Sequence, residues 1–246
     1  MFDLHMHSTF SDGKNTPEEM IQEGIRRGLS RIGISDHSYV EMDGSSMRPE
    51  SVEPYRREME RLKRKYSGTI EVLCGLERDY YSEDDAEYDY VIGSVHWVRM
   101  PDGHRMAVDW TPDRLENDCM KYFGGDWYAL AESYYALEAD VVRRTRCDII
   151  GHFDLVSKFN EQQRWFDPGH PKYVAAWQTA AAALLETGKP FEVNTGAISR
   201  GYTTDAYPSK EIRAWLRERG ANLILSSDAH QKENICFAFD HFQSEL

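Results

Sequence analysis

Residues 90–96 read Y-V-I-G-S-V-H, and this stretch decides the class of fold. Its apolar residues follow one another instead of alternating with polar ones, as expected for a strand that is covered on both faces. It ends in a histidine. The same arrangement recurs in R-I-G-I-S-D-H at 31–37, and N-L-I-L-S-S-D at 222–228 ends in an aspartate. We therefore predict a parallel sheet whose strands end in residues that can bind metals.

Apolar runs of this kind recur along the whole chain. Seven of them are predicted to be strands, and they cover residues 2–7, 31–36, 70–77, 90–96, 147–152, 190–195 and 222–227. Seven strands that end in metal-type residues favour a closed or nearly closed α/β barrel, which builds its site at the C-terminal ends of the strands. A doubly wound open sheet is the alternative, but it would concentrate its site near one switch point.

Helical patterns separate most of these strands. One begins at Thr16, where T-P-E-E forms a capping box with proline at the first helical position, and it stops at Gly28. Thr111 and Asp126 are predicted to cap helices in the region 112–145. Further helices are predicted over residues 51–66, 171–187 and 208–219.

The size and charge of the chain restrict its function. A length of 246 residues suits one barrel domain, which we predict to cover residues 1–246. The formal net charge of −13 repels polyanions, so nucleic acid is not an expected partner. No run approaches the roughly 20 apolar residues of a membrane span, and no leader pattern or C-x-x-C pair occurs. We expect a cytoplasmic protein; no pattern specifies its oligomeric state.

Nine residues of metal-ligating type lie at or just after the strand ends. They are His5, His7, Asp12, His37, Glu77, His96, His152, Asp228 and His230. Each alone is better explained as a turn residue, a surface acid or a buried histidine. Their recurrence at six of the seven strand ends favours a single site assembled from all of them.

The chemistry of this set indicates the metal. Six imidazoles and three carboxylates without a thiolate are typical of zinc, manganese or iron. At three or four protein ligands per ion, nine residues are enough for two or three divalent cations, with positions left for water and substrate. The remaining histidines, His104, His170 and His241, are predicted to be surface or structural residues.

The motifs H-M-H-S-T-F-S-D-G, S-D-H-S, G-L-E, G-S-V-H, G-H-F-D and S-S-D-A-H resemble, in order, those of the polymerase and histidinol phosphatase (PHP) family. The resemblance covers essentially the whole chain. It implies a distorted, TIM-barrel-like (β/α)7 barrel with a trinuclear metal centre. One ion would lie among His5, His7, Glu77 and Asp228. Glu77 would bridge to a second ion on His96 and His152. The third would lie among Asp12, His37 and His230.

Within the family, the segments at 151–160 and 192–202 resemble the histidinol-phosphate phosphatase branch. This resemblance implies that Lys158 and Arg200 bind phosphate, as an ammonium and a planar guanidinium can. It implies an enzyme, a metal-dependent phosphatase that hydrolyses a small anionic phosphomonoester. The specific substrate would be L-histidinol phosphate, cleaved to L-histidinol and phosphate in histidine biosynthesis. Asp228 would orient the attacking water, and His37 would assist the leaving alkoxide.

Three other functions are compatible with parts of the pattern. A PHP phosphodiesterase or nucleotidase, or a protein-tyrosine phosphatase, would use the same ligands. An amidohydrolase that cleaves C–N bonds also begins with H-x-H and ends with aspartate, but it commonly uses a carboxylated lysine on strand four, where this chain has His96. A non-catalytic metal-binding module is disfavoured by the complete ligand set.

Overall fold

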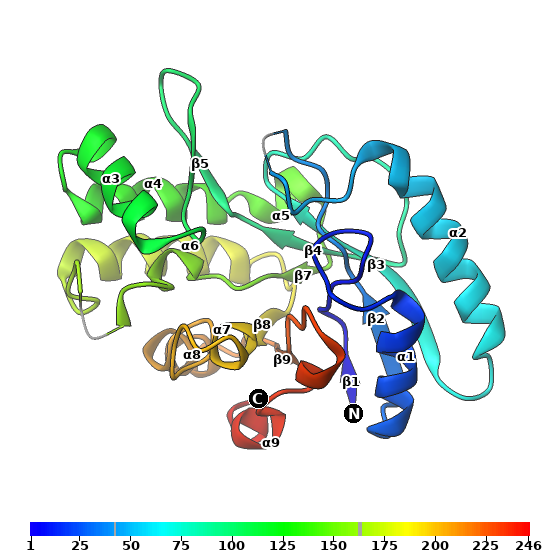
Figure 1. Cartoon of the computed structure of the whole chain (residues 1–246). Coiled ribbons are helices and arrows are strands. Elements are labelled where there is room, and N and C mark those ends of the chain that lie inside the picture. Colours follow the sequence, from blue (N-terminus) through cyan, green and yellow to red (C-terminus); the bar gives the residue numbers. More distant parts are fainter. Residues whose placement is uncertain (42, 162–163) are drawn as a thin grey trace.

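The computed structural model describes residues 1–41, 43–161 and 164–246. Its main sheet contains seven parallel strands that are hydrogen-bonded to one another in chain order. They are β1 (Phe2–Asp3), β2 (Arg31–Ile34), β3 (Glu71–Asp79), β4 (Tyr90–Ser94), β7 (Ile149–Ile150), β8 (Phe191–Asn194) and β9 (Leu223–Ser226). A parallel bridge between Met6 and Ala229 joins the segments that follow β1 and β9. This bridge closes the sheet at its C-terminal end, and the predicted distorted barrel is confirmed (Figure 1).

Helices surround the barrel. They are α1 (Pro17–Arg26), α2 (Pro49–Lys65), α3 (Pro112–Phe123), α4 (Trp127–Glu138), α5 (Val141–Thr145), α6 (Pro171–Leu185), α7 (Gly196–Ser199), α8 (Lys210–Glu218) and α9 (Phe239–Phe242). Short 3-10 turns are η1 (Leu155–Ser157), η3 (Lys232–Asn234) and η4 (Gln243–Glu245). Among the helices described, none has the length and apolar character to cross a bilayer. The capping box at Thr16 and the caps at Thr111 and Asp126 form as predicted.

The observed elements differ from the predicted ones mainly at their ends. The run predicted as a strand over 2–7 pairs regularly only at Phe2–Asp3, and the run over 147–152 only at Ile149–Ile150. The residues that follow leave the ladder and carry the candidate ligands. A hairpin of β5 (Trp97–Arg99) and β6 (Arg105–Ala107) was not predicted, because each strand has only three residues. It projects from the barrel in Figure 1.

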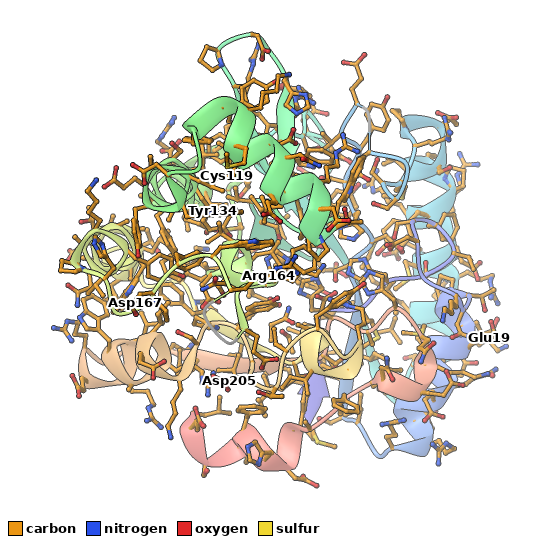
Figure 2. All side chains as sticks on the ribbon, turned by 60° about the vertical axis from the view of Figure 1, so that its left-hand side comes forward. Glu19, Cys119, Tyr134, Arg164, Asp167 and Asp205 are labelled. Carbon is orange, nitrogen blue, oxygen red and sulfur yellow. The ribbon has the colours of Figure 1, made fainter. Side chains whose placement is uncertain are left out.

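Two apolar clusters lie between the barrel wall and the helices. One joins α1 and α2 to β2 and β3, and the other joins α3, α4, α6 and α8 to β7, β8 and β9. Cys119 on α3 and Tyr134 on α4, both labelled in Figure 2, are buried in the second cluster. The two clusters cover opposite sides of the barrel, so its strands are buried on both faces as their continuous apolar runs require.

The barrel interior is filled around Tyr90 on β4. Its ring belongs to a small cluster with Ile92 and Ile149, and its hydroxyl donates to the carbonyl oxygen of Leu4 at 2.5 Å. Two glycines on two neighbouring strands face this ring. A Cβ atom added at Gly33 or Gly75 would overlap it. Glycine on β2 and β3 therefore makes room for the aromatic ring that fills the barrel.

We predict that Gly75→Ala destabilises the protein by about 1–3 kcal/mol, because an added methyl group overpacks the barrel interior against Tyr90. Gly44→Ala is the matched control, since a Cβ atom there meets nothing within 4 Å and its φ is not positive. Urea unfolding followed by circular dichroism measures both. Equal stability of the two variants would contradict the packing described for Tyr90.

Candidate metal centre

The site is organised around the carboxylate of Glu77, which lies near the C-terminal end of β3 and is only 1% exposed. Its Oε2 atom faces three imidazoles. It lies 2.7 Å from Nδ1 of His37, 3.3 Å from Nε2 of His5 and 3.5 Å from Nε2 of His7. The two histidines of the H-x-H motif therefore point to the same side, as their spacing predicted.

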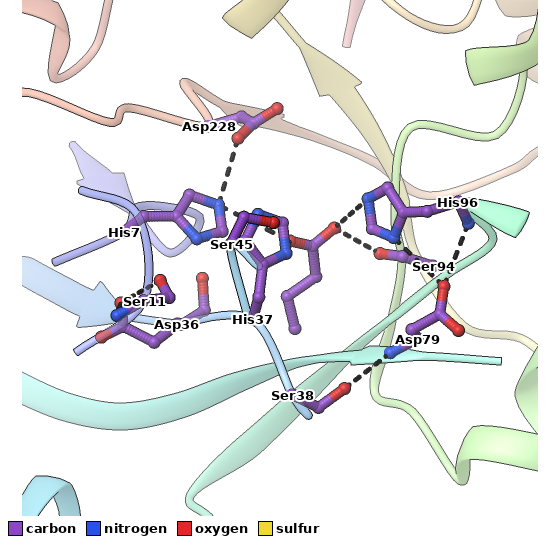
Figure 3. Close-up of polar contacts among 12 residues, drawn as sticks. His7, Ser11, Asp36, His37, Ser38, Ser45, Asp79, Ser94, His96 and Asp228 are labelled. Atoms are coloured by element: carbon purple, nitrogen blue, oxygen red, sulfur yellow. Dashed lines mark hydrogen bonds and ion pairs between the residues drawn. The ribbon is translucent and has the colours of Figure 1, made fainter. Parts of the chain in front are cut away.

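The other oxygen of Glu77 faces a separate pair of imidazoles. Its Oε1 atom lies 2.8 Å from Nε2 of His152 and 3.4 Å from Nε2 of His96, and it accepts a hydrogen bond from the hydroxyl of Ser94 at 2.6 Å. In Figure 3, His7 and Asp228 lie on one side of the view and His96 on the other, with His37 between them. Glu77 thus stands between two groups of nitrogen ligands.

Asp228 and Asp12 complete the cluster from two different loops. Oδ1 of Asp228 lies 3.2 Å from Nε2 of His7 and 3.8 Å from Nε2 of His5. Oδ2 of Asp12 lies 3.3 Å from Nε2 of His230, and its Oδ1 lies 3.8 Å from Nε2 of His37. All nine predicted residues are therefore brought together at the C-terminal ends of the strands.

The distances define three sets of atoms that lie close enough to hold an ion. Within each set the atoms lie within 4.8 Å of one another. The sets are His5, His7 and Asp228; His37, Glu77 and His96; and His7, Asp12, His37 and His230. They overlap with the grouping implied by the resemblance. They differ from it in that His7 and His37 each belong to two sets and His152 belongs to none, although its Nε2 lies 2.8 Å from Oε1 of Glu77.

The electrostatics of the cluster fit divalent cations. Burial lowers the pKa of His7 to about 3, helped by the neighbouring His37 and His230, so the ring stays neutral and one nitrogen keeps a lone pair. Burial raises the pKa of Glu77, but His37 and His5 outweigh it and hold the pKa well below its usual range. Among the described residues, Nε2 of His5 and both nitrogens of His7 are buried without a hydrogen-bond partner. Oε2 of Glu77 lies close to Nδ1 of His37 but has no partner in hydrogen-bonding geometry among the same residues. A metal ion satisfies such a set of donors.

Two acids that the sequence analysis missed hold the imidazoles in position. Oε1 of Glu192 lies 2.7 Å from Nδ1 of His5, and its Oε2 accepts the backbone N–H of His152 at 3.2 Å. Oδ2 of Asp79 lies 3.2 Å from Nδ1 of His96 (Figure 3). A carboxylate on the far nitrogen fixes the ring and leaves Nε2 free for a metal. The available signal for Glu192 was an acid inside the apolar run at 190–195.

The predicted phosphate-binding residues line one pocket of 260 Å³ together with His37, His96, His152 and Asp228. Arg200 reaches across it: its guanidinium lies 3.1 Å from Oδ2 of Asp228 and 3.0 Å from Nδ1 of His230. Lys158 donates to the carbonyl oxygen of Asp109 at 2.8 Å. Both cations therefore border the candidate centre.

The other histidines lie away from the centre, as predicted. His104 pairs with Asp118 at 3.3 Å, and Nδ1 of His170 accepts the backbone N–H of Lys172 at the start of α6. The ring of His241 packs edge-on against Phe242 in α9. All three take part in local structure.

Comparison with known proteins agrees with this fold. The model of the PHP domain matches residues 3–240. A probable histidinol-phosphatase of Schizosaccharomyces pombe is 28% identical over 89% of this chain and 76% of its own length. One from Deinococcus radiodurans is 28% identical over 99% of this chain and 92% of its own length.

Two solved structures have the same fold. The putative histidinol phosphatase of Listeria monocytogenes superposes with a TM-score of 0.87 at 18% identity and covers 98% of this chain and 100% of its own. The histidinol phosphate phosphatase of Lactococcus lactis, complexed with zinc, L-histidinol and phosphate, gives a TM-score of 0.73 at 23% identity. It covers 99% of this chain and 91% of its own.

A parallel barrel that gathers histidines and carboxylates at its C-terminal end is the architecture of a metal-dependent hydrolase. The family match extends over nearly all of the sequence, and this chain belongs to the PHP domain family. The family resemblance stated from the motifs is confirmed.

We predict that Glu192→Gln weakens metal binding about 10- to 100-fold, because the charge that orients and polarises His5 is lost. Glu186→Gln, an exposed position after α6, is the control. Titration of metal-free protein with zinc in competition with a chromophoric chelator measures both affinities. An unchanged zinc affinity in Glu192→Gln would show that this carboxylate does not support the centre.

Proposed function

We propose that residues 1–246 act as one catalytic domain that hydrolyses small phosphomonoesters with two or three divalent cations. The observation that carries this proposal is the placement of Glu77. Its two oxygens face separate sets of imidazoles, and imidazoles from both sets line the pocket that Lys158 and Arg200 border. A bridging carboxylate with cationic side chains beside it suits phosphate chemistry.

The nine clustered residues are the proposed ligands. One ion would lie among His5, His7, Glu77 and Asp228, a second on Glu77, His96 and His152, and a third among Asp12, His37 and His230. Zinc, manganese and iron all fit these donors. Bound cations would supply a hydroxide nucleophile at neutral pH and neutralise charge on the phosphoryl oxygens.

The remaining roles fall to side chains that border the pocket. Lys158 and Arg200 would bind the phosphoryl oxygens and spread their charge. Arg200 already holds Oδ2 of Asp228, so it fixes the carboxylate that would orient the attacking water. With two ions bound and the third site empty, the protonated ring of His37 would donate to the leaving alkoxide.

Among phosphomonoesters we propose L-histidinol phosphate, cleaved to L-histidinol and phosphate in histidine biosynthesis. Support comes from relatives in Schizosaccharomyces pombe, Deinococcus radiodurans and Bacillus subtilis that are named histidinol-phosphatases and match most of this chain. The Lactococcus lactis enzyme, which shares this fold, holds zinc, L-histidinol and phosphate.

A phosphate-release screen of metal-quantified protein tests the reaction class. The panel contains histidinol phosphate, a nucleoside monophosphate, a phosphotyrosine peptide and a bis-ester. We expect release from histidinol phosphate above the other monoesters and none from the bis-ester, and we expect loss of activity on chelation with recovery on adding zinc or manganese. Preferred cleavage of the bis-ester would replace the proposal with a phosphodiesterase.

We predict that Asp228→Asn and His152→Ala each lower kcat/KM for histidinol phosphate at least about 100-fold, because each removes a group from the reacting centre. His241→Ala, in α9 and outside the pocket, is the control and is expected to retain wild-type activity. Steady-state assays at saturating metal measure all three. Near-wild-type turnover in both site variants would overturn the assignment of the centre.

A further inference from the structure

Part of the wall of the pocket above the candidate centre consists of residues that are neither proposed metal ligands nor phosphate-binding cations. This part includes the side chains Asp43, Ser45, Trp97, Asp109, Trp110 and Tyr202. These side chains are acidic, hydroxyl-bearing or aromatic. Among the lining residues that the structure describes, the lysine and arginine side chains are Lys158 and Arg200. Phosphate binding does not require such a surface, so it has to serve another part of the substrate.

The aromatic part is exposed but firmly held. Trp110 is 38% exposed, yet its ring meets Trp97 edge-to-face with the centroids 5.1 Å apart, and the guanidinium of Arg114 lies 4.0 Å from its centroid. Such support keeps the indole in one orientation at the mouth of the pocket. A fixed, partly exposed indole offers a flat apolar surface to a planar group.

Asp109, the residue before Trp110, adds a carboxylate beside this surface. Its side chain is 23% exposed. Lys158 makes its shorter bond, 2.8 Å, to the backbone oxygen of Asp109, and its ammonium lies 3.4 Å from the carboxylate Oδ2. The ammonium also lies 4.7 Å from the ring centroid of Tyr202. Lys158 therefore has other partners besides the carboxylate of Asp109, and its contact with that carboxylate is the longer of its two contacts with this residue.

A second carboxylate lines the pocket from the loop before α2. Oδ1 of Asp43 accepts the backbone N–H of Ser45 at 2.9 Å, so part of this group is already engaged. Asp109 is therefore the better placed of the two acids to bind a ligand. A carboxylate beside a phosphate site repels phosphate, and it favours a substrate only when the substrate carries a compensating positive charge.

We propose that this wall selects phosphomonoesters whose leaving group combines a cation with a flat ring, with Asp109 pairing with the cation and Trp110 contacting the ring. The inference rests on the proposed phosphatase function and adds its specificity-determining residues. It also disfavours esters with anionic leaving groups, which Asp109 and Asp43 would repel.

The test compares the wild type, Asp109→Asn and Trp110→Ala on histidinol phosphate, p-nitrophenyl phosphate and glycerol phosphate. We expect Asp109→Asn to lower kcat/KM for the cationic ester at least tenfold more than for p-nitrophenyl phosphate, whose leaving group carries no cation. We expect Trp110→Ala to lower kcat/KM for both ring-bearing esters more than for glycerol phosphate. Asp113→Asn, an exposed aspartate on α3, is the matched control.

Calorimetry of metal-loaded protein provides a readout that does not depend on turnover. L-histidinol is expected to bind at least tenfold more weakly to Asp109→Asn than to the wild type, with a smaller change for inorganic phosphate. An equal loss of kcat/KM on all esters and of affinity for both ligands would make Asp109 a positioning residue for Lys158 and would overturn the inference. No loss of either quantity would also overturn it.

The two proposals fail in different ways. If the metal-loaded wild type released phosphate from p-nitrophenyl phosphate but disfavoured cationic esters, the phosphatase would stand and the specificity would fall. If it hydrolysed no monoester, the proposed function would fail, and the L-histidinol titration would still decide whether Asp109 binds the cation.

Discussion

The burial of one carboxylate among imidazoles is the constraint on which the rest of the structure depends. Glu77 is almost inaccessible to solvent, and five histidines approach its two oxygens. An ionised carboxylate in such a place is costly unless positive charge surrounds it. Burial opposes protonation of His5, His37 and His96, but the surrounding carboxylates outweigh it and raise their pKa values, so these rings supply part of that charge. Burial lowers the pKa of His7 to about 3, so this ring supplies none. Bound cations would take the place of these protons and add positive charge around the carboxylate.

The barrel is built to deliver side chains to this point. β3, the longest strand, carries Glu77 near its end, and a parallel bridge between His37 and Glu77 extends the pairing with β2 as far as the centre. The bridge between Met6 and Ala229 brings the first and last ligand motifs together, because each of its residues lies next to a ligand. The bridge that closes the barrel therefore also brings ligands of the site together.

The sequence predicted those features that depend on local pattern. Continuous apolar runs predicted the parallel strands, and the histidine or acid at each end predicted which residues converge. The sequence did not reveal Glu192, because an acid within a short apolar run gives no sign of which imidazole it will contact from another strand. The family resemblance implied that Arg200 binds phosphate, which stays a prediction. It did not imply that the guanidinium bonds to Asp228, since that contact joins residues 28 positions apart. The division of the nine ligands among ions stays a prediction.

The candidate ligands and the remaining residues that line the pocket come from different parts of the fold. This difference explains how one metal centre can serve different substrates. The candidate ligands come from strand ends, or from turns next to them, and the pairing of seven strands fixes their positions. Trp97 starts the β5–β6 hairpin, and Asp109 and Trp110 lie between that hairpin and α3, in the long insertion between β4 and β7. A change in this insertion alters the leaving-group surface without disturbing the barrel. The family match accounts for the metal chemistry, and the substrate has to be inferred from the residues of the insertion.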